Sequence, residues 1–255
     1  MPYKPLSLPR GLNRELESIV RERVDPFLSD VHNMFRLPYE EDPNGEGGCN
    51  FPIATTLVGV LAGVTSVPNI DTRGRSGSLF KTLVNDHYPA DPSGAGAIDK
   101  NKLADALWDL YRCPLEHSLG SFDDDTRKNV EKIFGVGTIT DLSVDKGRLT
   151  EDVIRGIEEK ADKTVGMNVP MPLEFGPTLR IEGTHLRLTA RVFYWGVRQA
   201  VIKWAEAQIQ QTSTSQQINL ALGPTEVSSG STSNIATPNA PRSWVERGST
   251  GPIYK

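Results

Sequence analysis

The chain has 255 residues, with 28 Lys and Arg against 32 Asp and Glu, so its formal charge is −4 at neutral pH. This balance excludes a histone-like or polybasic nucleic-acid binder, although it leaves local basic faces open. The two cysteines are too few for a disulfide scaffold or a cysteine-only zinc site.

Composition divides the chain into three parts. Residues 1–10 contain three prolines and are expected to form a flexible arm. Residues 11–211 carry the periodic apolar pattern of a folded helical domain. Residues 212–255 hold 14 Ser or Thr among 44 residues and few large apolar side chains. Burial there cannot offset the entropy of ordering, so a disordered tail is expected.

The N-terminal half of the domain predicts amphipathic helices around one apolar helix. Apolar residues recur at steps of three and four from Gly11 to Leu37. Asp25 is interpreted as a helix cap and Pro26 as a first-turn proline, which suggests two helices in series. The segment Phe51–Val67 is almost as long as a bilayer span. It contains Thr and Ser and lacks flanking aromatic or basic anchors, so a buried helix is favoured over a membrane span. A cytoplasmic location is therefore expected.

Further along, the pattern remains mainly helical. The predicted helices cover about 78–87, 100–111 (capped by Asp99), 123–134, 150–163 and 189–210. Alternation over 135–144 predicts a strand, and the apolar pairs on either side of Gly183 predict a β-hairpin over 177–188. The expected fold class is mainly α, with a small β-hairpin inserted into a helical bundle.

The strongest candidate for chemistry is the segment LWDLYRCPLEHSLG, residues 107–120. It places Arg112 and His117 at the end of a predicted helix, with four residues between them. A guanidinium can hold a phosphate and stabilise charge that develops on it. An imidazole can accept and return a proton near neutral pH. These two groups suffice for metal-free cleavage of RNA, whose ribose 2′-hydroxyl supplies the nucleophile.

The sequence YRCPLEHS resembles the motif of the HEPN superfamily, an Arg and a His four to six residues apart near the end of a helix. The preceding LWDLY helix, together with Phe80 and the run His87-Tyr88-Pro89, looks like uncharacterised bacterial proteins with this motif. The resemblance implies a HEPN-like helical bundle that forms a homodimer, with the motifs of two subunits facing each other. It implies no cofactor and no metal.

The same resemblance implies two kinds of function. Many HEPN proteins are metal-independent endoribonucleases of toxin–antitoxin or phage-defence systems, which predicts RNA and an antitoxin or defence-complex protein as partners. In that case Arg112 and His117 are catalytic. Other HEPN proteins are noncatalytic modules for dimerisation or interaction. This sequence has Cys113 directly after the Arg and Pro114 inside the motif, and Leu119 stands where one toxin subfamily has a tyrosine.

Two further patterns compete with this site. Arg180 and His185 form a second Arg-x4-His pair, but they flank the predicted hairpin turn and are interpreted as exposed strand residues. Three arginines and a tyrosine at helical spacing form a candidate RNA-binding stripe, for which a solvated helix face is the alternative. The stripe consists of Arg187, Arg191, Tyr194 and Arg198. The run Asp123–Asp125 is interpreted as helix-capping residues rather than metal ligands.

Overall fold

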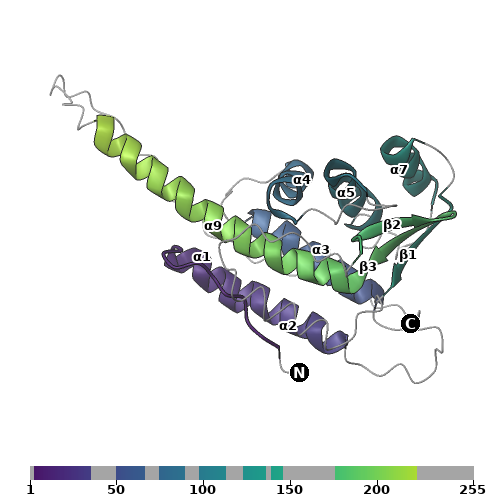
Figure 1. Ribbon diagram of the computed structural model, residues 1–255, viewed down its shortest axis with the longest axis horizontal. Helices are drawn as coiled ribbons and strands as arrows, with labels where there is room; N and C mark the ends of the chain where they lie inside the picture. The colour runs from purple at the N-terminus through teal and green to yellow at the C-terminus, as the bar shows by residue number, and fades with distance from the viewer. Residues whose placement is uncertain are drawn as a thin grey trace, which may run out of the picture.

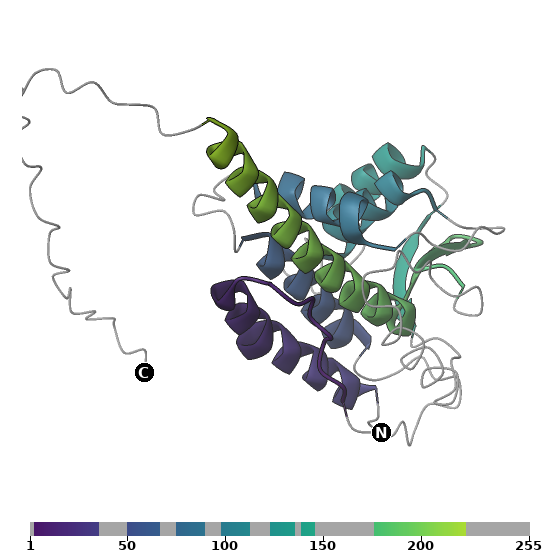
Figure 2. The ribbon, with the colours of Figure 1, turned by 60° about the vertical axis from the view of Figure 1, so that its left-hand side comes forward.

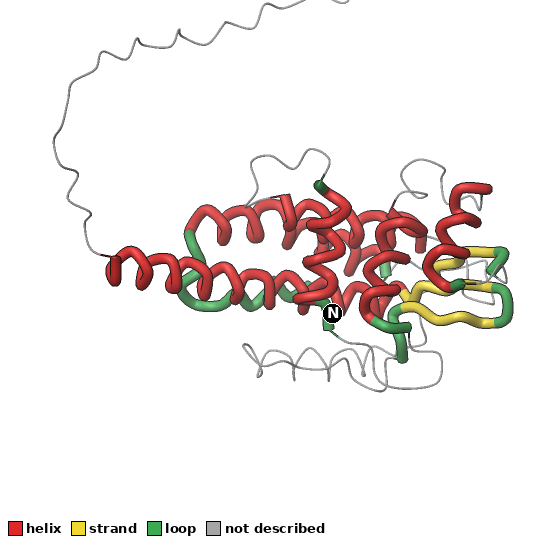
Figure 3. The backbone as a smooth tube through the Cα atoms, turned by 90° about the horizontal axis from the view of Figure 1, so that it is seen from above, coloured by secondary structure: helices red, strands yellow, loops and turns green. Residues whose placement is uncertain are grey.

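The computed structural model describes residues 3–35, 50–66, 75–89, 98–112, 123–135, 139–145 and 176–222, with side chains up to residue 211. The described chain is mainly helical, with one three-stranded sheet at one end of the helical body (Figures 1 and 3). This confirms the predicted mainly α class. The elements are α1 Arg14–Ile19, η1 Val20–Val24, α2 Asp25–Met34, α3 Asn50–Ser66, α4 Ser76–His87, α5 Lys100–Ala106, η2 Leu107–Arg112, α7 Asp124–Phe134, β1 Asp141–Asp145, β2 Leu179–Glu182, β3 His185–Thr189 and α9 Ala190–Leu222.

Helix α3 lies at the centre of the body. It packs against α2, α4, α9 and η2 and touches β1, and Figures 1 and 2 show it enclosed between α2, α4 and α9. The predicted buried helix is thus confirmed. No helix within the described ranges is long and apolar enough to cross a membrane. The buried apolar residues of α3 are Ile53, Ala54, Leu57, Val58, Val60, Leu61 and Val64.

The first helical segment runs without a break past Pro26, so two separate helices are not formed. Residues 14–34 are helical throughout, and the turn before Pro26 is the π-helix η1. In a regular α-helix the proline ring would clash with the carbonyl four residues earlier. The wider π turn accommodates the ring at that point. Asp25 is therefore not a helix cap, contrary to the sequence-based interpretation.

The expected flexible arm is held against the helices by a buried carboxylate. Asp25 Oδ1 accepts hydrogen bonds from the Tyr3 hydroxyl (2.7 Å) and the Leu6 amide (3.0 Å). Arg21 Nη1 donates to Asp25 Oδ2 (3.0 Å) and to the Leu6 carbonyl (2.7 Å). Leu6 itself is buried in the core. Residues 3–10 are thus packed as part of the fold, because Asp25 and Arg21 satisfy backbone groups that burial removes from water.

The sheet combines the predicted hairpin with a strand from earlier in the chain. Strands β2 and β3 are antiparallel and join at Gly183, whose φ of 59° suits glycine. Strand β1 pairs with β3 in parallel and is the other edge, giving the order β1-β3-β2. The hairpin is confirmed. The strand expected over 135–144 is shorter and begins at Asp141, and its parallel pairing was not predicted.

Helix α9 is longer than the sequence indicated. It was expected to end near residue 210, but the backbone stays helical to Leu222, past the predicted start of the tail at residue 212. Its far end projects beyond the other helices, away from the sheet (Figure 1). The predicted helix over 150–163 and the tail beyond residue 222 lie outside the described residues.

A glycine of α9 allows a close helix–helix contact. Gly196 lies against the ring and hydroxyl of Tyr88, the residue that follows α4. The Tyr88 hydroxyl is 3.0 Å from Thr178 Oγ1 in a buried hydrogen bond, which ties the start of the hairpin to the same contact. A β-carbon at position 196 would overlap the Tyr88 side chain.

We expect Gly196→Ala to lower the free energy of unfolding by about 1–3 kcal/mol, because the buried Tyr88 ring must move to make room. Urea denaturation followed by circular dichroism measures the change. In a Tyr88→Leu background the same Gly196→Ala substitution should cost clearly less. An equal cost in both backgrounds would contradict the assignment of the strain to Tyr88.

We also expect Asp25→Ala to destabilise the fold by about 2–4 kcal/mol, since it leaves buried donors without their acceptor. Asp30→Ala, at an exposed position of the same helix, is the matched control and should change stability by less than about 0.5 kcal/mol. Thermal unfolding of both variants, with protease sensitivity near residue 6, measures the effect. Comparable stabilities would show that Asp25 does not hold the N-terminal segment.

Candidate functional site

Arg112 lies in the last turn of η2, with its guanidinium stacked on Trp108. The Arg112 Cζ atom is 4.7 Å from the Trp108 ring centroid, a distance typical of a cation–π contact. Trp108 in turn packs against Phe80 of α4, with ring centroids 5.1 Å apart, and against Gly77. The side chain of Arg112 is partly exposed. The aromatic surface of Trp108 therefore orients the charged group of Arg112.

Tyr111 fixes the end of η2 to the sheet. It is completely buried, and its hydroxyl lies 3.1 Å from the Leu186 carbonyl of β3 and 3.3 Å from the Ser143 carbonyl of β1. Burial raises the pKa of Tyr111 well above its usual range, and the carboxylates of Asp141 and Asp145 raise it further. The hydroxyl therefore stays protonated and donates, which holds the backbone next to Arg112 in one position.

An ion-pair triad braces α5 and η2 against α4. Lys81 Nζ is 2.8 Å from Asp105 Oδ1 and 2.9 Å from Asp109 Oδ2. Partial burial by itself lowers the pKa of Lys81, but hydrogen bonds to the two carboxylates outweigh it, and the net pKa is raised. Lys81 therefore stays charged. The triad adds a second tie between α4 and the helix that carries Trp108 and Arg112.

His117, the second predicted catalytic residue, lies outside the described residues, as do Cys113 and Pro114. The structure therefore positions Arg112 and its supports but not the complete Arg-x4-His pair. Tyr111 and Lys81 have supporting roles that the sequence did not reveal, because their partners lie on strands and on another helix.

Both members of the competing pair, Arg180 and His185, contact carboxylates on the sheet. His185 Nδ1 is 3.0 Å from Asp141 Oδ2, across the β1–β3 pairing. Arg180 contacts Asp145 Oδ2 at 2.9 Å and Glu182 Oε1 at 2.8 Å. Each member thus has carboxylate partners of its own.

The candidate RNA-binding stripe does not form one exposed face. Tyr194 and Arg198 are buried, and Arg198 Nη2 donates to the Lys4 carbonyl at 2.9 Å. Arg198 also lies over the rings of Tyr3 and Tyr194. The partly exposed members are engaged as well, since Arg191 stacks on Phe35 and Arg187 lies 3.3 Å from Glu182 Oε2. Tyr194 therefore offers no open face on which a base could stack.

The acidic run behaves as a cap. Asp123 accepts a hydrogen bond from the Thr126 amide at 2.8 Å at the start of α7, and Asp125 pairs with Lys128. Within the described ranges, no cluster of three or more His, Cys, Asp or Glu side chains has the arrangement of a metal site.

Comparison with protein-family models, curated proteins and solved structures gave no match for this chain. The geometry around Arg112 is therefore interpreted on its own chemistry and on the sequence resemblance.

A titratable cluster lies away from Arg112, between α4, α5 and α9. Burial lowers the pKa of His87, and the positive charges of Lys100 and Lys203 lower it further, against the opposing effect of Asp86. The pKa values of Lys100 and Lys203 are also lowered, first by burial. Burial and the two lysine charges, one on α5 and one on α9, therefore disfavour an added proton on His87.

We expect acidification to destabilise the protein through His87. Its pKa in the unfolded chain is near 6.5 and is lower in the fold, so the folded state takes up fewer protons. Stability is then retained above about pH 6.5 and lost as the pH falls through the folded-state pKa. Urea denaturation of the wild type and His87→Asn at pH 7.5 and 5.5 tests this, and the variant should lose less stability. Equal losses would assign the pH dependence to other groups.

Proposed function

We propose that the protein is a metal-independent endoribonuclease of HEPN type that acts as a homodimer, with Arg112 and His117 as catalytic residues. The observation that carries the proposal is the placement of Arg112. Its guanidinium is stacked on Trp108 at the end of a helix that Tyr111 anchors to the sheet. Such preorganisation suits a group that must meet a phosphate in one orientation.

The chemistry follows from the two side chains. His117 accepts the proton of the ribose 2′-hydroxyl, whose oxygen attacks the adjacent phosphorus. The protonated imidazole then delivers a proton to the departing 5′-oxygen, so the products are a 2′,3′-cyclic phosphate and a 5′-hydroxyl. Arg112 stabilises the negative charge that builds up on the phosphoryl oxygens in the transition state. DNA lacks the internal nucleophile and is not a substrate.

The biological setting in this proposal is a cytoplasmic toxin–antitoxin or phage-defence system, with RNA as substrate and an antitoxin or defence-complex protein as regulator. The support for it is the sequence resemblance of YRCPLEHS, together with a described fold that is mainly helical.

The deciding experiment is RNA cleavage by the purified full-length chain in excess EDTA. We expect His117→Ala to lower the rate by about 10²–10⁴-fold and Arg112→Ala by about 10²–10³-fold. Arg112→Lys should restore little, because a lysine keeps the charge but loses the bidentate fork. End analysis of the products should show cyclic phosphates.

His185→Ala is the matched control, since it removes the histidine of the competing pair, and it should cleave at the wild-type rate. Melting temperatures of all variants separate lost chemistry from lost folding, which matters for Arg112 because it packs on Trp108. The absence of cleavage by the wild type, or dependence on added divalent metal, would contradict the proposal.

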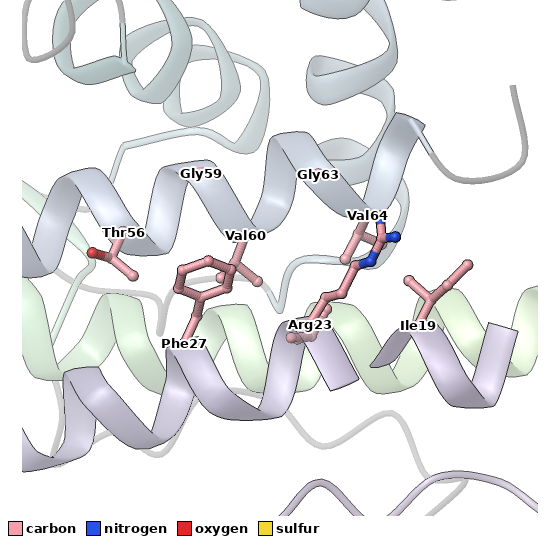
Figure 4. Close-up of a pocket in the computed structure, with 9 residues that line it drawn as sticks. Ile19, Arg23, Phe27, Thr56, Gly59, Val60, Gly63 and Val64 are labelled. Atoms are coloured by element: carbon pink, nitrogen blue, oxygen red, sulfur yellow. The ribbon is translucent and has the colours of Figure 1, made fainter. Parts of the chain in front are cut away.

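A noncatalytic interaction module of the same fold is the second candidate. It is favoured by the uncharged exposed side of α3, which includes the exposed Phe51, and by the exposed Phe27 of the neighbouring α2 (Figure 4). In that case Arg112 stabilises the helix end, and substitution of Arg112 or His117 changes only the melting temperature.

A further inference from the structure

Gly77, in the first turn of α4, lies directly against the edge of the Trp108 ring. A β-carbon at position 77 would lie 3.0 Å from both Cε2 and Nε1 of Trp108 and 3.3 Å from Cζ2. Carbon atoms in favourable van der Waals contact are about 3.5–4.0 Å apart, so these distances are too short. Any side chain at position 77 would therefore force the indole ring to give way.

The backbone at position 77 does not itself require glycine. Gly77 is the second residue of α4, and its neighbours Ser76 and Ser78 are exposed. The described glycines with a positive φ are elsewhere, at positions 11, 135, 176 and 183. Alanine is a better helix former than glycine, so local structure favours alanine at this position. The contact with Trp108 is the feature that favours glycine instead.

The indole ring has little room to move without changing the position of Arg112. On one side the ring meets Phe80, which is fully buried, with ring centroids 5.1 Å apart. Lys81, one turn after Gly77, is tied to two aspartates of α5 and η2, so α4 is held close to the helix that carries the ring. The guanidinium of Arg112 is stacked on the same ring. A shift or tilt of the ring therefore moves the guanidinium as well.

We propose that Gly77 is a positioning residue for Arg112 and acts through Trp108. The absence of a side chain at position 77 sets the position of the indole ring, and the ring sets the direction of the guanidinium. The inference deepens the proposed ribonuclease and rests on it for the effect on cleavage. An arginine that holds a phosphate through two parallel hydrogen bonds needs a defined direction. Misplacement of a reacting group by about 1 Å can lower a rate by about 10²-fold.

A purely structural role for Gly77 predicts different effects. If Gly77 only allowed α4 to pack, a side chain there would lower stability, and the protein that remained folded would be fully active. If Gly77 positions Arg112, the folded protein itself loses rate. In that case kcat and kcat/KM fall by the same factor, because the weakened interaction is made in the transition state.

The first experiment observes Arg112 by nuclear magnetic resonance and needs no RNA. A guanidinium stacked on an indole lies in the ring current, which moves the side-chain proton signals of the arginine upfield. We expect this displacement in the wild type with isotope-labelled arginine, its loss in Trp108→Leu, and a clear reduction in Gly77→Ala. The signals are assigned by their loss in Arg112→Lys.

Gly59→Ala is the matched control for the same measurement. It makes the same substitution within a helix, at a position where a β-carbon would meet no atom within 4 Å. The Arg112 signals should stay at their wild-type positions in this variant.

The second experiment measures RNA cleavage by the full-length chain, with a melting temperature for each variant. We expect Gly77→Ala to lower kcat about tenfold and Gly77→Leu to lower it about 10²-fold, with KM unchanged. Gly59→Ala should cleave at the wild-type rate. In a Trp108→Phe background the smaller ring leaves room for the β-carbon, so Gly77→Ala should cause little further loss.

Three results would overturn the proposal. Arg112 signals that are not displaced in the wild type, or that keep their positions in Gly77→Ala, would show that position 77 does not orient the guanidinium. Altered signals with an unchanged kcat would show that this orientation does not matter for cleavage. An equal loss of rate in the wild-type and Trp108→Phe backgrounds would show that the effect does not pass through the ring.

The failure of the ribonuclease proposal would look different. A wild type that cleaves no RNA contradicts that proposal, and the Arg112 signals then decide by themselves whether Gly77 positions Arg112.

Discussion

The fold depends on burying a helix that has no charged side chain. Helix α3 is apolar on most sides, so it is stable in water only when other elements cover it. Helices α2, α4, α9 and η2 pack around it, and Asn50 at its start donates to the Val144 carbonyl of β1 at 3.0 Å. Segments from both ends of the chain therefore meet on one helix, so we expect the helical body to unfold as one cooperative unit. Helix η2, which carries Arg112, packs on this same helix.

Burial of the N-terminal segment is possible because two charged groups take over the hydrogen bonds that water would make. Asp25 accepts hydrogen bonds from the Tyr3 hydroxyl and the Leu6 amide, while Arg198 donates a hydrogen bond to the Lys4 carbonyl. Burial raises the pKa of Tyr3; Arg198 opposes this effect and Asp25 adds to it, with the result that the hydroxyl stays a donor. The hydrogen bond from Arg198 links residues 3–10 to α9, which explains why a charged residue lies in the core.

Sequence signals that involve residues only a few positions apart, such as helix caps and turn glycines, predicted the local structure well. Asp99 and Asp123 accept the amide hydrogen bonds expected of helix caps, and Gly183 forms the turn of the hairpin. The failures involve distant partners. The spacing of Arg191, Tyr194 and Arg198 suggested a solvated stripe, but Arg198 is bonded to a residue 194 positions away. No periodicity in α9 could reveal that the N-terminal segment would cover it. The parallel pairing of β1 with β3 is equally non-local.

For the candidate site, the sequence indicated the Arg112 motif and the aromatic residues before it, and the four-residue spacing of Trp108 and Arg112 is consistent with the observed stacking. It could not reveal that Tyr111 is bonded to two strands, because those strands follow 30 or more residues later. These long-range contacts hold the end of η2, which carries Arg112, in place. Helix η2 packs on the inner side of α3, whose outer side is uncharged and exposed. The helix that forms the centre of the body is therefore also the surface on which the support of Arg112 rests.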